Sequence, residues 1–237
     1  MQVEDMEGLE PPTLVREVWE RFGDASVFTT SLGAEDMVIL HMMSAMEVGM
    51  EVVTIDTGRL PEETYALIGE VERFLGIRVK VYFPDTGEVE EMVRRHGVNL
   101  FYDSAEKRHL CCYVRKVRVL ERALKGRSAW VSGIRRGQTE ARANTSRVEW
   151  DSVHGLWKFN PLADWSYQMV WAYIRENHVP YNALHDRGYR SIGCAPCTRA
   201  VREGEDERAG RWWWESGVKE CGLHTGWVPA DFRLGGR

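Results

Sequence analysis

Short apolar runs alternate along the chain with longer stretches whose apolar residues recur at helical spacing. The apolar runs predict strands at residues 26–30, 51–55, 78–83, 129–133 and 157–160. The helical spacing predicts helices at residues 13–22, 35–47, 61–75, 88–96, 106–124 and 166–177. Strands separated by helical segments are typical of a mostly parallel sheet with helices on both faces, so we expect an α/β fold of this kind.

The regular alternation stops near Asn182, where Gly, Arg, Trp and Cys become frequent. We therefore expect a single domain over residues 1–237, with an α/β core to about residue 181 and a functional C-terminal segment over 182–237. No apolar stretch approaches the length of a membrane span, so no membrane partner is expected. The first ten residues are acidic and lack the apolar stretch of a secretory signal, which predicts a cytoplasmic protein.

The charge balance argues against one class of partner. Hydrophobic residues make up 43% and charged residues 28% of the chain, as in an ordinary globular protein. Lys and Arg total 31 against 36 Asp and Glu, giving a net charge of −5. Proteins that bind nucleic acid non-specifically usually carry a basic domain, so we expect no nucleic-acid partner.

Polar loops follow three of the predicted strands, where ligands of a parallel sheet bind. The first contains Ser31 and Gly33 directly before a helix, where backbone N–H groups can bind an anion. The second begins at Asp56, which could hold a ribose or amino group or simply cap the next helix. The third contains the pair Arg135 and Arg136, suited to bidentate recognition of phosphate or sulfate, although a solvated basic loop has the same composition. Together the loops favour a nucleotide or anion site.

The chain has five cysteines, an odd number that fits metal binding plus one remaining thiol better than a disulfide framework. Cys111 and Cys112 are adjacent in a predicted helix, and Cys194 and Cys197 form a CxxC further along. Four thiolates can hold zinc or an iron–sulfur cluster, and the CxxC alone could be a redox pair. The fifth, Cys221, lies near Lys219 and His224, whose positive charge could lower its pKa, although an ordinary exposed cysteine would look the same.

Several long segments give the chain a family resemblance. They are SLGAEDMV (31–38), IDTGRLPEETY (55–65), CC with Arg115 and Lys116 (111–116), GIRRGQTEARAN (133–144), GCAPCTRAVREGEDERAGRWWWE (193–215) and KECGLH (219–224). Over nearly its whole length the chain resembles the assimilatory adenylyl-sulfate and phosphoadenylyl-sulfate reductases. The resemblance implies an adenine-nucleotide α-hydrolase-like fold with a C-terminal iron–sulfur and catalytic segment. It also implies a [4Fe–4S] cluster on the first four cysteines and, because those cysteines are present, adenylyl sulfate as the substrate.

The same resemblance implies roles for individual residues. Cys221 matches the nucleophile, with His224 as its neighbour on the substrate side. Residues that match the sulfate end of the substrate or the nucleotide pocket are Lys116, Arg208, Arg211, Ser31, Gly33, Arg135, Arg136 and Asp56. Thr57 and Trp212 match positions close to the cluster. A thiolate attacking sulfur would expel AMP and leave a cysteine S-sulfonate, from which reduced thioredoxin would release sulfite. We also expect a homo-oligomer.

Two other interpretations compete with a reductase. A tRNA-thiolating enzyme also combines an adenylating α/β fold with cysteines and a cluster, but it would need an SGGxDS loop, and here Gly33 is the only glycine of the turn. A zinc-stabilised binding module would use the four cysteines without catalysis. The colour of the purified protein would separate this module from both enzymes.

Overall fold

The structure, a computed structural model, describes residues 2–216 and contains one mixed sheet. The strands of the described chain are β1 (Ser26–Thr30), β2 (Glu51–Ile55), β3 (Val79–Tyr82), β4 (Ala129–Val131), β5 (Val148–Asp151) and β6 (Leu156–Phe159). Their order is β3-β2-β1-β4-β6-β5, and every neighbouring pair is parallel except β5 with β6. The predicted mostly parallel sheet is confirmed, with the antiparallel edge strand β5 as an addition.

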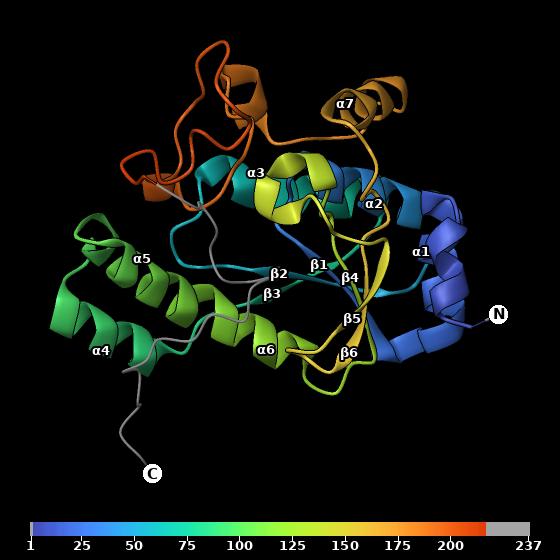
Figure 1. Cartoon of the computed structure of the whole chain (residues 1–237), viewed down its shortest axis with the longest axis horizontal. Helices are drawn as coiled ribbons and strands as arrows, with labels where there is room; N and C mark the ends of the chain where they lie inside the picture. The colour runs from blue at the N-terminus through green and yellow to red at the C-terminus, as the bar shows by residue number, and fades with distance from the viewer. Residues whose placement is uncertain (1, 217–237) are drawn as a thin grey trace.

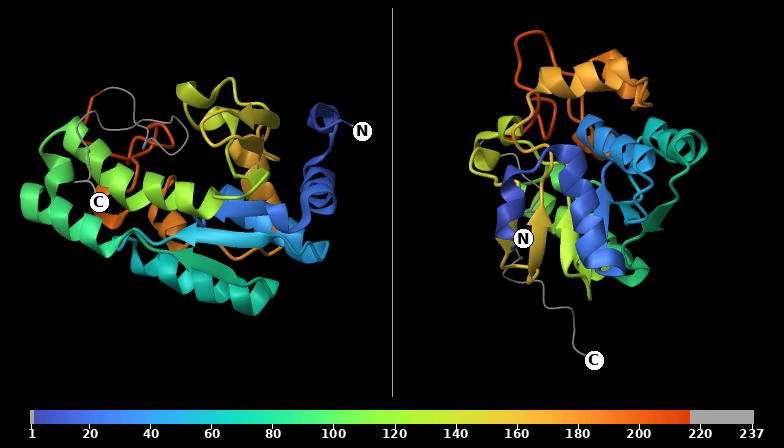
Figure 2. Two further views of the ribbon diagram at one scale, coloured as in Figure 1. Left: turned by 90° about the horizontal axis from the view of Figure 1, so that it is seen from below. Right: turned by 90° about the vertical axis from the view of Figure 1, so that its right-hand side faces the viewer.

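Helices cover both faces of this sheet, as predicted (Figures 1 and 2). The helices are α1 (Pro11–Phe22), α2 (Ala34–Ala45), α3 (Glu62–Glu70), α4 (Thr86–His96), α5 (Ala105–Cys112), α6 (Arg118–Leu124) and α7 (Tyr167–Glu176). The main core joins one face of the sheet to α1, α2 and α7. A smaller core joins the other face to α6, where Leu120 and Leu124 pack with Trp130. Because α2 lies between the sheet and two other helices, it is apolar on nearly every side.

The predicted helix over 106–124 is continuous but changes its winding. Between α5 and α6 the five residues Tyr113–Val117 form a π-helical turn, η5. This wider turn begins directly after Cys111 and Cys112 and carries Lys116. Single π-turns inside α-helices occur frequently at functional sites, because they alter which side chains share one face.

The described part of the C-terminal segment, residues 182–216, lies across the carboxyl ends of the strands as loops with two short 3₁₀ turns, Ala183–Arg187 and Ala195–Cys197 (Figure 1). It is joined to the loop after β2, because the backbone N–H of Ala195 donates to the carbonyl of Arg59 at 2.8 Å. An isolated β-bridge between Thr198 and Arg211 closes the segment on itself. The segment thus forms a cover over the sheet edge where ligands bind.

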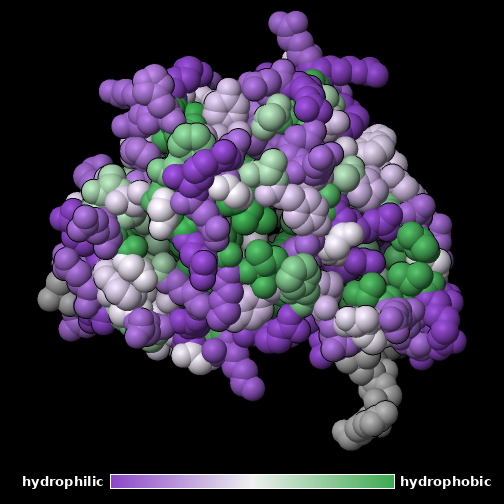
Figure 3. Space-filling model, turned by 180° about the vertical axis from the view of Figure 1, so that it is seen from behind, coloured by the Kyte–Doolittle hydropathy of each residue, from purple (hydrophilic) through white to green (hydrophobic). Residues whose placement is uncertain are grey.

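Within residues 2–216, no helix has both the length and the apolar character to cross a bilayer. On the face shown in Figure 3, apolar residues appear in small groups surrounded by polar ones.

Candidate active site

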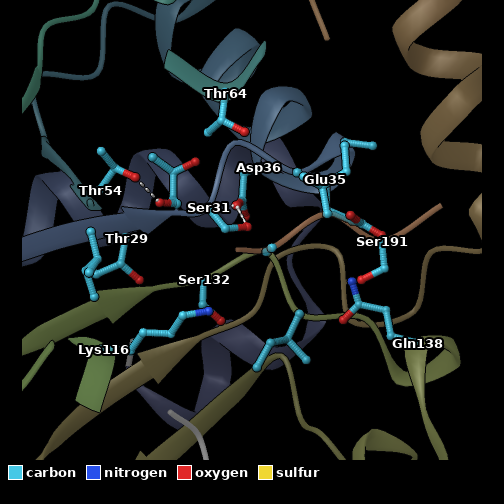
Figure 4. A pocket seen from close by; sticks show the side chains of 18 of the residues that line it. Thr29, Ser31, Glu35, Asp36, Thr54, Thr64, Lys116, Ser132, Gln138 and Ser191 are labelled. Carbon is cyan, nitrogen blue, oxygen red and sulfur yellow. Dashed lines mark hydrogen bonds between the residues drawn. The ribbon is translucent and has the colours of Figure 1, made fainter. Parts of the chain in front are cut away.

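A cavity of about 220 Å³, here called the large cavity, lies at the carboxyl ends of β1, β2 and β4 (Figure 4). Its wall combines the three loops expected from the sequence with residues of the C-terminal segment. The polar lining includes Ser31, Gly33, Ser132, Gln138, Ser191 and Arg208. Figure 4 shows Lys116 extending into the cavity toward Ser132. The cover and the core therefore build one site together.

The loop after β1 is organised around the buried carboxylate of Asp36. Ser31 donates to it twice, through its backbone N–H at 2.6 Å and its hydroxyl at 2.9 Å. Burial raises the pKa of Asp36 to about 6, against the opposing effect of these two hydrogen bonds. Gly33 directly precedes helix α2, and the start of this helix lines the large cavity. The backbone N–H groups of its first turn are therefore available to an anion in the cavity. Both predicted residues, Ser31 and Gly33, line the large cavity.

Gly133, after β4, provides the space that Asp36 occupies. A Cβ at position 133 would overlap Oδ1 of Asp36 and lie 3.3 Å from its backbone nitrogen. We expect Gly133→Ala to displace Asp36 and the loop of Ser31, at a cost of about 1–3 kcal/mol in stability. Calorimetric titration with AMP should show affinity reduced about tenfold or more. Gly69→Ala is the control, because a Cβ there meets nothing within 4 Å in helix α3 and should leave AMP affinity unchanged.

Asp56 lies beside the large cavity but does not line it. Its Oδ1 accepts the backbone N–H of Gly58 at 2.7 Å and the hydroxyl of Tyr65 at 2.9 Å. Burial, together with the hydrogen bond to Asp56, raises the pKa of Tyr65 to about 12. The carboxylate therefore holds the loop that presents Thr57 to the cavity.

The arginine pair predicted for the nucleotide pocket does not line the large cavity either. Arg135 is only 1% exposed and binds Glu35 at 2.6 Å and Glu207 at 2.8 Å. Arg136 lies nearer the surface, paired with Asp164. The structure thus uses both guanidinium groups to join elements, since a buried arginine is stable only with carboxylate partners.

Two cavity-lining cations were absent from the predicted set. Arg142 follows the arginine pair in the same loop, and this proximity was its sequence signal. Arg190 comes from the C-terminal segment and has no motif of its own. With Lys116, Arg208 and Arg211, five basic side chains line the large cavity. Its acidic residues are Glu35 and Glu207, which pair with Arg135, and Asp36, which accepts two hydrogen bonds from Ser31. The five Lys and Arg side chains outnumber these carboxylates, so the cavity favours an anionic ligand.

The four cysteines described by the structure come together, although they are far apart in sequence. Cys111, Cys112, Cys194 and Cys197 are buried and belong to one cluster with Trp212. They line a second, smaller cavity of about 20 Å³, here called the cysteine cavity. Its remaining wall is strongly basic and consists of Arg59, Arg108, Arg115, Lys116 and Arg211, with Phe101, Pro196 and Trp212.

The thiols of this cavity differ in acidity. Burial raises the pKa of Cys111, and it raises that of Cys197 to about 12. For Cys194 burial also opposes ionisation, but Lys116, a hydrogen bond with Thr57 at 3.2 Å, and nearby arginines outweigh it and lower the pKa. The positively charged wall therefore favours at least one thiolate.

The chemistry of this residue set fits a metal cofactor. Four cysteine sulfurs are the ligands preferred by iron–sulfur clusters and by zinc, and the surrounding cations would offset their negative charge. Over residues 2–216, no three His, Cys, Asp or Glu side chains already stand in the arrangement of a formed metal site. The four cysteines thus allow a metal cofactor. Cys221 and His224 lie outside the described residues.

The sheet order and the large cavity at its carboxyl edge belong to the adenine-nucleotide α-hydrolase-like fold class, and the basic lining suits an anionic ligand. Residues 25–200 match the phosphoadenosine phosphosulfate reductase domain family, and the chain belongs to that family. It is therefore an oxidoreductase, which favours the reductase interpretation over a tRNA-thiolating enzyme or a non-catalytic module.

Several relatives are similar over most of the chain. The adenosine 5'-phosphosulfate reductase of Allochromatium vinosum is 54% identical over 85% of this chain and 79% of its own length. That of Burkholderia cepacia is 48% identical over 94% of this chain and 90% of its own length. The crystal structure of phosphoadenylyl-sulfate reductase from Candida auris, a phosphate complex, is 30% identical with a TM-score of 0.70, covering 84% of this chain and 96% of that one. The FMN adenylyltransferase of Candida glabrata, at 15% identity and a TM-score of 0.55 over 81% of this chain and 61% of that one, shares the fold.

Proposed function

We propose that this protein reduces adenylyl sulfate to sulfite and AMP in sulfate assimilation. The relatives named for adenosine 5'-phosphosulfate are 54% and 48% identical to it, whereas the reductase named for the phosphorylated substrate is 30% identical. The four buried cysteines support the same substrate through the family resemblance. The cover supplied by residues 182–216 supports a single reductase domain, because the large cavity is incomplete without it.

One observation carries the proposal: Lys116 and Arg211 line both the large cavity and the cysteine cavity. A nucleotide in the large cavity can therefore place its anionic end beside these cations. A sulfuryl group carries dispersed negative charge, which must be neutralised before an anionic thiolate can attack. Arg208 and Arg142 add positive charge to the lining of the large cavity. Ser31 and Gly33, at the start of α2, are suited to the phosphate.

The cysteine cavity would hold a [4Fe–4S] cluster on Cys111, Cys112, Cys194 and Cys197. When bound, the cluster would supply an electrostatic centre next to the sulfate end of the substrate. Thr57 orients Cys194 through the 3.2 Å hydrogen bond. The wall of arginines and Lys116 keeps the negative charge of the thiolates from repelling the substrate.

The reaction proceeds at Cys221. Its thiolate, with a pKa lowered by Lys219 and His224 nearby in sequence, attacks the sulfur of adenylyl sulfate. The bond from sulfur to the phosphate oxygen breaks, AMP leaves with the electron pair, and a Cys221 S-sulfonate remains. A reduced dithiol such as thioredoxin then releases sulfite, returns the Cys221 thiolate and is itself oxidised to a disulfide. This chemistry requires reduced thiols, which supports a cytoplasmic location.

The test is sulfite release by purified protein supplied with reduced thioredoxin. We expect kcat/KM for adenylyl sulfate to exceed that for its 3′-phosphorylated analogue by at least about tenfold, a difference of about 1.4 kcal/mol in transition-state binding. Omitting thioredoxin is the control: AMP should be released once per site, and no sulfite should be released, because the sulfonate stays on Cys221. Comparable kcat/KM values for the two substrates would refute the assignment, and sulfite release from neither would refute the activity.

A further inference from the structure

Arg108, one turn before the cysteine pair of α5, forms a buried ion pair with Glu215. Its Nε donates to Oε1 of Glu215 at 2.9 Å, and its Nη2 donates to Oε2 at 2.8 Å. The side chain of Arg108 is 1% exposed and that of Glu215 is 11% exposed. A bidentate pair of this kind fixes the relative orientation of both groups, and here it joins α5 to the last part of the described chain.

The same guanidinium group stacks on Trp212. The guanidinium carbon of Arg108 lies 4.5 Å from the centre of the Trp212 ring, and that of Arg211 lies 4.7 Å from it. Trp212 is 1% exposed and has a φ of 42°, a left-handed conformation that a bulky residue adopts only where its surroundings hold it. Arg108 is thus part of what keeps Trp212 in place, and Arg211 precedes Trp212 directly in the chain.

These contacts connect α5 with Arg211 and with the chain that leads to Cys221. Through Trp212, Arg108 supports Arg211, which lines the large cavity and the cysteine cavity. Through Glu215, it fixes the chain six residues before Cys221. Six residues reach at most about 20 Å, so the position of Glu215 sets an upper bound on its distance from the Cys221 thiol. Such a bound raises the effective concentration of the thiol at the substrate.

We propose that Arg108 is a positioning residue for the transfer step, acting through Glu215 on Cys221 and through Trp212 on Arg211. This rests on the proposed function, in which Cys221 attacks the substrate. A purely structural role would alter folding and cofactor content together. A positioning role predicts slow sulfonate formation in protein that is folded and binds nucleotide normally.

The main variant is Glu215→Gln, which removes the charge of the carboxylate and keeps its shape. The control is Glu205→Gln, because Glu205 also forms a bidentate pair, with Nη1 and Nη2 of Arg199 at 2.8 and 2.9 Å, but within its own loop and nearer the surface. Each protein is given adenylyl sulfate without reductant, and the Cys221 sulfonate is followed over time by mass spectrometry. Iron content, AMP affinity and the rate of trypsin cleavage after Lys219 in the presence of AMP are measured in parallel.

We expect Glu215→Gln to form the sulfonate between about tenfold and 100-fold more slowly, the range for a misplaced reacting group, with iron content and AMP affinity unchanged. Cleavage after Lys219 should be faster than in the wild type, while Glu205→Gln should match the wild type throughout. Because Glu215→Gln leaves Arg108 buried without its carboxylate, the double variant Arg108→Met with Glu215→Met is also tested. That pair leaves no buried charge and should show the same slow transfer in folded protein.

Wild-type rates of sulfonate formation and cleavage in Glu215→Gln and the double variant would overturn the proposal, as would a loss of rate that only follows a loss of iron. Failure of the proposed function is distinguishable. In that case the wild-type protein itself forms no sulfonate on Cys221, and cleavage after Lys219 alone decides whether Glu215 fixes the following chain.

Discussion

Replacing Cys221 by serine should abolish sulfite release while leaving iron content and AMP affinity at wild-type levels. An alcohol near neutral pH is a far poorer nucleophile than a thiolate, so the transfer step should lose almost all of its rate. The measurement is sulfite release with thioredoxin, together with release of AMP from adenylyl sulfate. Wild-type protein without reductant should release one AMP per site and stop, with the sulfonate on the peptide that contains Cys221.

Two results would contradict this mechanism. The first is full turnover in Cys221→Ser. The second is a sulfonate located on one of the four buried cysteines in the wild type. Reduced thioredoxin should remove the sulfonate from Cys221, and an adduct that resists reduced dithiols would indicate a dead-end product instead of an intermediate.

Replacing Cys194 by serine should remove the cofactor and the activity together. Serine is a poor ligand for iron, and Cys194 is the thiol with the lowered pKa among the cysteines that line the cysteine cavity. Anaerobically purified wild-type protein should be brown and contain iron and acid-labile sulfide, whereas Cys194→Ser should be colourless and inactive. Iron and sulfide analysis and visible absorption are the measurements.

Thr57→Val provides the matched control for Cys194→Ser. It removes the 3.2 Å hydrogen bond to the sulfur of Cys194 but keeps the ligand and the approximate volume of the side chain. We expect this variant to retain iron. A wild-type protein that is colourless, contains zinc and is active would disprove the iron–sulfur assignment.

Most of the sheet could be predicted from the sequence because its strands are short, apolar and separated by helices. The exception is β5, whose sequence Val148–Asp151 is half charged and only partly buried, as suits an edge strand. The π-helical turn η5 was missed as well, because its apolar spacing differs little from that of a regular helix. These elements depend on tertiary packing and not on local pattern.

The site residues that lie in sequence motifs could be predicted. The ion pairs between residues far apart in the sequence could not. The sequence located the four buried cysteines and the loops of Ser31 and Gly33. It did not show that Arg135 would pair with Glu35, 100 positions away, and with Glu207, 72 positions away. Two arginines after a strand look the same whether they face a ligand or internal carboxylates, so only the fold distinguishes the two outcomes.

The wall shared by the two cavities has a thermodynamic consequence. Lys116 and Arg211 face both, so an anion that enters one cavity changes the field felt in the other. Such coupling is reciprocal: if a group held by the cysteines alters the dissociation constant of a nucleotide by some factor, the nucleotide alters the retention of that group by the same factor. The nucleotide concentration would then regulate the loss of the cofactor. Chelators would remove the cofactor at different rates from the nucleotide-free and the nucleotide-bound enzyme.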